Sequence, residues 1–425
     1  MDGKSTEYGL KIMNTEKDMT FEIKPVAGGV CAAKGFVANG IWCGIRKNKT
    51  KKDLALIVSE CPADAAAVYT RNLVKGAPLV VTKKHVDGGK IKAVICNSGN
   101  ANTCNADGEE VAEKTCEYTA QALGVAAREI AVASTGVIGQ PLDVTPIANG
   151  IPALVAGLGA NGLAAAEAIM TTDTEVKEIA VEFTIDGKTC RLGGIAKGSG
   201  MIHPDMATML VFLTTDVSIS AEMLSKALKG DVDKTFNMLS VDGDTSTNDM
   251  VLLLANGMAG NARIEEENDA FDTFMCALNT VNVALCRMIA GDGEGATKLL
   301  ECEVTGAKTL ADARIAAKSV ICSSLFKAAM FGADANWGRV LCALGYSGAN
   351  LDVTKIDVAF SSPAGKIEVC KNGAGVEFSE EVAKKILLEK EITVLVALND
   401  GDACASAWGC DLTYDYVKIN GDYRT

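Results

Sequence analysis

Histidine is almost absent from this sequence, and its scarcity limits the chemistry available to the chain. His85 and His203 are the only histidines among 425 residues. A zinc site with several histidine ligands would need both, and no cysteine pair stands at metal-ligand spacing. A serine–histidine–aspartate triad would have to use one of the two, and no GxSxG motif presents the serine. The composition therefore argues against metal catalysis and a histidine-activated serine.

Motifs for phosphates and for disulfides are also scarce. The phosphate-binding pattern GxxxxGK[ST] is absent. A single GxGxxG occurs at Gly157, Gly159 and Gly162, but the segment before it fits a helix ending in glycines as well as a dinucleotide site. The 15 cysteines are scattered singly, without a CxxC pair. We expect buried, reduced thiols.

Clustered basic residues and long apolar runs are missing too. The formal net charge is −13, and the one short basic run, residues 46–52, fits a solvated loop. Nucleic acid is therefore a poor partner, because phosphate binding needs clustered Lys and Arg. No stretch reaches the ~18 apolar residues of a membrane span, and the N-terminus lacks a secretory pattern. We expect a cytoplasmic protein that binds no membrane.

Helical and strand patterns alternate along the whole chain. With only 8 prolines and no low-complexity linker, the sequence predicts one layered α/β or α+β architecture. Apolar spacing predicts helices at residues 107–123, 221–239, 269–290, 320–330 and 380–389. Short β-branched runs predict strands, buried on both faces or nearly so, at residues 92–96, 207–215 and 392–398.

One nucleophile needs no histidine. A hydroxyl can use the α-amine of its own residue as base once the chain is cut in front of it. An α-amine has a pKa near ~8, so a useful fraction is neutral near pH 7. The histidine-poor composition permits this mechanism without requiring it.

A family resemblance points to where such a cut would fall. Residues 197–216 read KGSGMIHPDMATMLVFLTTD and closely resemble the self-cleaving glutamate/ornithine N-acetyltransferases, the ArgJ type. These proteins cut themselves before the Thr of an Ala-Thr-Met-Leu segment, which here is the Ala207–Thr208 bond. Further family-like motifs follow in the family's order: NSGNANTCNADG, ASTGVIGQPL, AIMTTDT, DGEGATK and DLTYDYVKINGDYRT.

The resemblance implies an architecture as well as an activity. It implies a layered α/β scaffold shared with self-processing DmpA-like aminopeptidases. After the cut, residues 1–207 and 208–425 would form an α and a β chain that interlock in one fold. The family expectation is an α2β2 heterotetramer.

The resemblance also assigns catalytic roles. Thr208 matches the nucleophile, which would attack the acetyl group of N-acetylornithine, release ornithine and pass the acetyl group to glutamate. Thr135 and Gly136 match the oxyanion-hole pair, where a hydroxyl and a bare backbone can approach the developing charge. His203 and Asp205 precede the cut and could position the bond for cleavage or simply shape the turn around Pro204.

The substrate is a charged amino acid derivative, so its site should hold both a cation and an anion. Positions that match family substrate-binding residues are Thr171, Lys197, Thr208, Glu294, Asn420 and Thr425. Lys197 suits the substrate carboxylate and Glu294 the ornithine ammonium. Thr172 remains an alternative to Thr171, because a one-residue offset is possible.

Several alternatives remain open at the level of sequence. The enzyme would need no cofactor, but acetyl-CoA could serve as a second acetyl donor, or the chain could be a monofunctional ornithine acetyltransferase. A self-processing aminopeptidase or amidase would use the same threonine with water as acceptor. A non-enzymatic module that never cleaves is the last alternative. Asp242, Asp244 and Asp249 resemble calcium ligands, but their spacing does not match an EF-hand.

Overall fold

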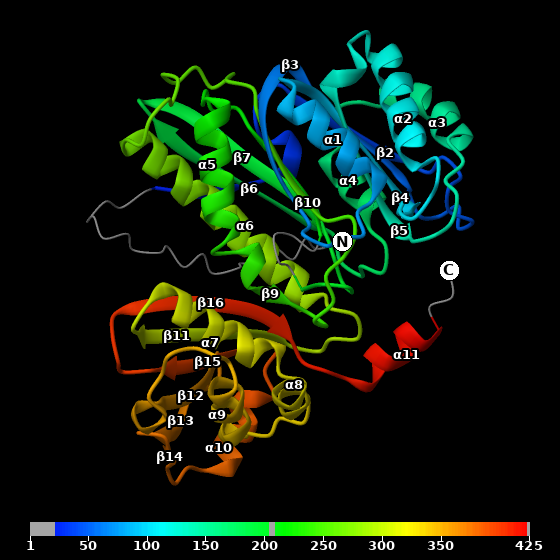
Figure 1. The fold of residues 1–425 in the computed structure, drawn as a ribbon. Coiled ribbons are helices and arrows are strands. Elements are labelled where there is room, and N and C mark those ends of the chain that lie inside the picture. The colour runs from blue at the N-terminus through cyan, green and yellow to red at the C-terminus, as the bar shows by residue number, and fades with distance from the viewer. Residues whose placement is uncertain (1–21, 204–208, 423–425) are drawn as a thin grey trace, which may run out of the picture.

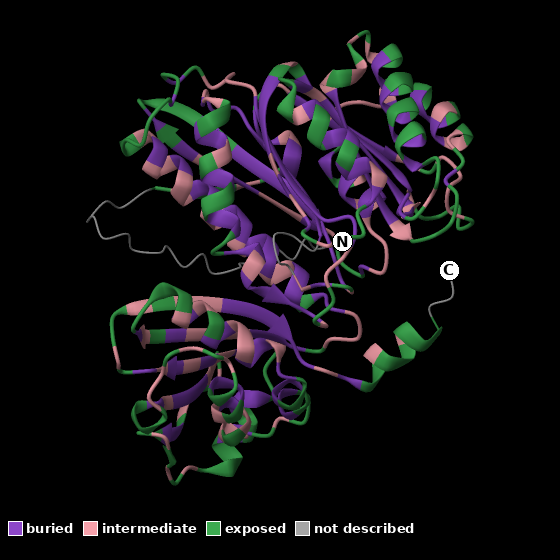
Figure 2. Ribbon diagram, in the orientation of Figure 1, coloured by how far each residue is buried: buried purple, intermediate pink, exposed green. Residues whose placement is uncertain are grey.

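The predicted mixed α/β fold is confirmed. The computed structural model describes residues 22–203 and 209–422, which form two β-sheets with helices packed on them (Figure 1). The strands of the first sheet are largely buried, those of the second are buried in part, and the outer faces of the helices are exposed (Figure 2).

The first sheet has nine strands within the described residues, in the order β1-β6-β7-β8-β10-β3-β4-β5, with β2 paired to β3. Its strands are β1 (Lys24–Val26), β2 (Phe36–Ile41), β3 (Leu54–Tyr69), β4 (Ile91–Asn100), β5 (Ile130–Val137), β6 (Lys177–Ile185), β7 (Lys188–Lys197), β8 (Leu210–Thr215) and β10 (Met250–Ala255). The apolar strands β8 and β10 run parallel and are buried along their whole length. Such runs are typical of strands covered on both faces.

Helices cover both faces of this sheet. Around it lie α1 (Ala77–Asp87), α2 (Gly108–Leu123), α3 (Thr145–Ala156), α4 (Gly162–Ile169), α5 (Ala221–Val232) and α6 (Asp269–Gly291). Apolar side chains of α2 and α3 pack on one face of β3, β4 and β5, and those of α4 pack on the opposite face. Helix α6 contacts β6 and β7, whereas α5 contacts β3 and β10 (Figure 1).

The second sheet has seven strands in the described part of the chain, in the order β14-β13-β12-β15-β11-β16-β9. Its strands are β9 (Leu239–Ser240), β11 (Leu299–Ala307), β12 (Asp357–Ser362), β13 (Gly365–Lys371), β14 (Ala374–Gly375), β15 (Glu391–Ala397) and β16 (Ala403–Cys410). The helices near it are α7 (Leu310–Cys322), α8 (Ser324–Phe331), α9 (Trp337–Gly345) and α10 (Glu380–Leu387).

The prediction that residues 392–398 are buried on both faces was wrong. In β15, Ile392, Val394 and Val396 are buried, whereas the residues between them are partly exposed. This alternation is typical of a strand with one solvated face. The sheet packs its buried face against α7 and α10 and leaves the other face partly open.

Helix α6 joins the two sheets. By length and composition it is the one helix in the described residues that could cross a membrane, with a mean hydropathy of 1.4. It contacts β6 and β7 of the first sheet and β11 and β16 of the second. Its buried Asn282 donates a hydrogen bond of 2.7 Å to Asp231 of α5. These contacts are those of a core helix.

Two predicted helices are broken by polar residues. The helix predicted at residues 221–239 ends at Val232, because the chain turns after Asp231 and Thr235 and enters the second sheet as β9. The segment predicted at 320–330 spans the end of α7 and α8, since the Ser323 side chain accepts from the Phe326 N–H and starts a new helix. The other predicted helices match α2, α6 and α10, and residues 92–96 lie in β4.

Segments from both sides of residues 207–208 share the first sheet. Strand β8 pairs with β7 through Leu210 and Lys197, and β10 pairs with β3. The bond predicted to be cut lies outside the described residues. The pairing nevertheless makes the preceding and following segments one folded unit.

Candidate active site

Thr135 and Gly136 lie at the end of β5, where its parallel pairing with β4 becomes irregular. Gly136 has φ of +130°, and a Cβ atom there would lie 2.4 Å from the Gly99 carbonyl carbon. Only glycine fits such a backbone without displacement. Thr135 is buried, and its hydroxyl makes no hydrogen bond to any described residue.

A small cavity of about 20 Å³ brings Thr135 together with Lys197. Lys197 is the last residue of β7, and its side chain is buried without a hydrogen bond or ion pair to the described residues. A buried ammonium is costly unless an opposite charge approaches it. The cavity is lined by Thr135, Lys197, Gly200, Met201, Ile202, Met209, Leu210, Ser246, Asn248 and Asp249.

Asn248 fixes the cavity wall. Its side-chain amide donates to the carbonyls of Ala101, at 2.6 Å, and Ser134, at 2.9 Å. Its carbonyl oxygen accepts from Thr103 and Thr247. These bonds hold the loop after β4 and the end of β5 against the segment that precedes β10.

Asp249 supplies a buried carboxyl group to the same cavity. Its Oδ2 atom is buried and has no hydrogen-bond partner in the described structure. Burial raises the pKa of Asp249 well above its ordinary value, although a hydrogen bond from Ser246 and the positive charge of Lys197 act in the opposite direction. A buried carboxyl group with a raised pKa beside a lysine is typical of a functional site.

Glu294 lies at the edge of this cavity. A Cβ atom on Gly200, which lines the cavity, would lie 2.3 Å from the Glu294 carboxyl carbon. The absence of a side chain at residue 200 thus makes room for the carboxylate. Asn420 Nδ2 donates to Glu294 Oε2 at 2.8 Å. The fold therefore brings the C-terminal segment back to the predicted anion.

Thr171 is linked to Lys197 indirectly. Its N–H donates to Asp173 Oδ2 at 2.9 Å, and the N–H of Gly198 donates to Asp173 Oδ1 at 2.6 Å. Thr171 is not among the residues that line the cavity. The offset alternative, Thr172, is untested by this geometry.

Three of the predicted positions cannot be placed. Thr208, Thr425 and Asp205 lie outside the described residues. Met209, which follows Thr208 in the sequence, does line the cavity. Asn248, Asp249 and Gly200 were not predicted as site residues, although Asn248 and Asp249 stand directly before the apolar strand β10, a position from which side chains often reach a site.

The two histidines have separate partners. Buried His85 has Nδ1 2.7 Å from the Ile130 carbonyl. His203 has Nδ1 3.0 Å from Ser240 Oγ and 3.6 Å from Cys322 Sγ, and its carbonyl accepts from Thr245. These contacts fit the packing role that the sequence left open for His203.

The other sequence motifs have local explanations. Gly157 and Gly159 lie between helices α3 and α4, and Gly162 is the first residue of α4, whereas a dinucleotide fingerprint requires a strand before the helix. Asp242 accepts the N–H groups of Met201 and Ile202, at 2.6 and 2.8 Å, so it shapes the cavity wall.

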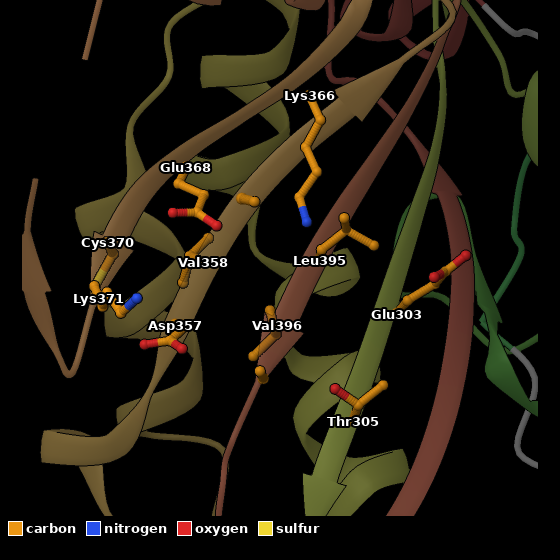
Figure 3. Close-up of a pocket in the computed structure, with 12 residues that line it drawn as sticks. Glu303, Thr305, Asp357, Val358, Lys366, Glu368, Cys370, Lys371, Leu395 and Val396 are labelled. Carbon is orange, nitrogen blue, oxygen red and sulfur yellow. The ribbon is translucent and has the colours of Figure 1, made fainter.

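A larger hollow of about 300 Å³ lies on the open face of the second sheet (Figure 3). Its polar lining includes Glu303, Lys366 and Glu368, on β11 and β13. None of the predicted site residues lines it. The smaller cavity beside Met209 is therefore the candidate active site.

Comparison with known proteins shows the family to which the chain belongs. The ArgJ family model matches residues 37–425. The arginine biosynthesis bifunctional protein ArgJ of Caldanaerobacter subterraneus subsp. tengcongensis is 50% identical over 400 residues, 94% of this chain and 99% of that protein. The arginine biosynthesis bifunctional protein ArgJ 1 of Clostridium acetobutylicum is 53% identical over 392 residues, 92% of this chain and 96% of that protein.

A solved structure is also similar. The arginine biosynthesis bifunctional protein of Bacillus halodurans is 46% identical, with a TM-score of 0.48, covering 50% of this chain and 98% of that chain. Because the family model and the two relatives each match nearly the whole sequence, this chain belongs to the ArgJ family.

Proposed function

We propose that this chain is an acetyltransferase of arginine biosynthesis that moves the acetyl group of N2-acetyl-L-ornithine to L-glutamate through an acetyl ester of Thr208. The observation that carries the proposal is the shared cavity of Thr135 and Lys197, which Met209 also lines. Relatives of about half-identical sequence are named as proteins of arginine biosynthesis.

Before any turnover, hydrolysis of the Ala207–Thr208 bond by one water molecule frees the α-amine of Thr208. The new α-amine of Thr208 takes the proton from its hydroxyl, and the oxygen attacks the acetyl carbonyl. Thr135 and the Gly136 N–H stabilise the resulting oxyanion. One donor in this role lowers the activation barrier by roughly 2.7–4 kcal/mol. The α-amine returns the proton to the leaving nitrogen, which frees ornithine. The amine of glutamate then attacks the ester and releases N-acetylglutamate.

Charge complementarity supports the binding roles. The buried ammonium of Lys197, which lines the cavity, meets the substrate α-carboxylate. Glu294, held by Asn420, meets the δ-ammonium of ornithine. Thr171 and Thr425 complete the binding set. No cofactor is required.

The names of the two relatives favour a second acetyl donor besides N-acetylornithine. Both are called bifunctional, which supports use of acetyl-CoA to acetylate glutamate directly. An assay with acetyl-CoA and glutamate, without acetylornithine, tests this step. A rate equal to that of the Thr208→Ala variant would leave ornithine acetyltransfer as the sole activity.

The shared sheet supports an assembly of cleaved chains. Residues 1–207 and 208–425 stay together, since β8 and β10 pair with β7 and β3. Two such pairs form the α2β2 heterotetramer, and the enzyme acts in the cytoplasm.

Intact mass of the denatured, reduced protein tests the proposal. Wild type should give two species, residues 1–207 and 208–425, and the second should gain the mass of one acetyl group when incubated with acetylornithine. Thr208→Ala should remain a single uncut chain. An uncut wild type in a folded sample would refute the mechanism, and release of acetate without N-acetylglutamate would indicate a hydrolase.

A further inference from the structure

A buried charge cluster, formed by Asp173, Lys177 and Asp292, lies beside the candidate site. Lys177 Nζ is 2.8 Å from Asp173 Oδ1 and 2.5 Å from Asp292 Oδ2. The three side chains are 0%, 1% and 6% exposed, in the order Asp173, Lys177, Asp292. We infer that this cluster positions the substrate-binding residues, an inference that rests on the proposed function.

Asp173 holds two segments that carry predicted binding residues, one with Thr171 and one with Lys197. Its two carboxylate oxygens accept the N–H groups of Thr171 and of Gly198, the residue after Lys197. Burial alone would raise the pKa of Asp173, but the charges of Lys197 and Lys177 outweigh it and hold the pKa below its usual value. Asp173 is therefore an anion shared between a cluster lysine and a substrate-binding lysine.

Asp292 holds the segment that carries Glu294, a third predicted binding residue. Its carboxylate accepts the N–H of Thr174 at 3.1 Å and also binds the Thr174 hydroxyl. Its carbonyl accepts from Ser199 Oγ at 2.6 Å, and the Glu294 N–H donates to the Ser199 carbonyl at 2.9 Å. The placement of Glu294 thus depends on the same cluster as that of Thr171 and Lys197.

The cluster also joins the two sides of the proposed cut. Asp173 and Lys177 precede residue 208, and Asp292 follows it. Because desolvation offsets the attraction, a buried ion pair gives little net stability over apolar packing. Here every carboxylate oxygen of Asp173 and Asp292 also accepts a backbone N–H or hydroxyl from residues 171–175 or 198. That arrangement fixes the geometry of the binding segments.

The test measures the dissociation constant of L-ornithine by calorimetry, using the cleaved protein. Asp292→Asn keeps the side-chain volume and removes the charge that Lys177 meets. We expect it to weaken ornithine binding about tenfold or more, because charge-assisted bonds that set the site are lost. The KM for N-acetylornithine should rise in parallel, with kcat changed less than about threefold.

Two further variants keep the test decisive. Thr174→Val, at an exposed position, removes one hydroxyl bond to Asp292 and should weaken binding about threefold even if Asp292→Asn fails to fold. Asp231→Asn is the matched control, a buried aspartate bound to Asn279 and Asn282, none of which lines the cavity. It should lower the melting temperature and leave ornithine binding unchanged.

The outcomes separate the inference from the proposed function. Wild-type affinity in both Asp292→Asn and Thr174→Val would overturn the positioning role. If wild type binds ornithine but transfers no acetyl group, the proposed function fails, while weaker binding by the variants still supports the cluster. A wild type that binds no ornithine overturns both.

Discussion

Asn420 Nδ2 donates a hydrogen bond to Glu294 Oε2 across 126 residues of sequence. The bond brings the last helix, α11 (Tyr414–Asp422), to the loop after α6, although the helix extends from the body and is largely exposed (Figures 1 and 2). Thr413 Oγ1 anchors its start to the Gly295 carbonyl at 2.6 Å. The structure thus brings the C-terminal helix to Glu294, one of the predicted binding residues.

Asn420→Ala should raise the KM for N-acetylornithine about three- to tenfold, because a hydrogen bond to a charged group is lost at a partly solvated position. The kcat value should change little, since the residue contacts Glu294 and not the reacting atoms. Steady-state kinetics measure the split. Lys418→Ala, on an exposed position of the same helix, is the control and should match wild type. An unchanged KM in Asn420→Ala would argue against a binding role for Glu294.

The family resemblance, not a local pattern of residues, assigned part of the candidate site. The Thr135–Gly136 pair and Lys197 stand in short Gly-rich segments, and the structure brings Thr135 and Lys197 to one cavity. Asp249 and Asn248 could not be assigned in the same way. Their place depends on the parallel pairing of β10 with β8, which sets Met250 opposite Leu210. Long-range register of this kind is not encoded in local periodicity.

The sequence predicted which helices and strands form more accurately than it predicted where they end or how far they are buried. The uninterrupted pattern of α6 marks one long helix, and the structure agrees. The apolar run of β15 suggested burial on both faces, but whether a second layer covers a strand depends on tertiary packing. Ser323 divides α7 from α8 because its hydroxyl caps the second helix, a local effect that apolar spacing hides.

Gly136→Ala should abolish most of the acetyl transfer. The residue has φ of +130°, and the new Cβ would lie 2.4 Å from backbone at Gly99, so the strand end must move. Displacing an oxyanion donor lowers kcat by roughly 10²–10³. Gly139→Ala is the matched control: φ is +77° and nothing lies within 4 Å of the new Cβ. It should cost about 1 kcal/mol of stability and spare kcat. Wild-type turnover by Gly136→Ala would contradict the oxyanion assignment.

Gly200→Ala should impair binding without unfolding the protein. The new Cβ would lie 2.3 Å from the Glu294 carboxyl carbon, at the far end of a flexible side chain. We expect that carboxylate to rotate away, lose Asn420 and raise the KM for N-acetylornithine about tenfold. The control is Gly230→Ala in α5, where the new Cβ meets nothing within 4 Å. The melting temperature and KM of both variants provide the comparison, and an unchanged KM in Gly200→Ala would count against the role of Glu294.

Asp249→Asn should change how stability depends on pH. Burial raises the folded-state pKa of Asp249, so its stabilising contribution is complete below the unfolded value of about 4 and is lost as pH rises toward the folded value. Asparagine cannot ionise and avoids this loss. The melting temperature of the variant relative to wild type should therefore rise by a few degrees between pH 4 and pH 8. In an otherwise wild-type protein, Ser246→Ala should make the melting temperature fall more steeply as pH rises, because the Ser246 hydrogen bond lowers the pKa of Asp249. If the melting temperatures of wild type and Asp249→Asn changed in parallel with pH across this range, Asp249 would have the same pKa in the folded and unfolded states, contrary to this prediction.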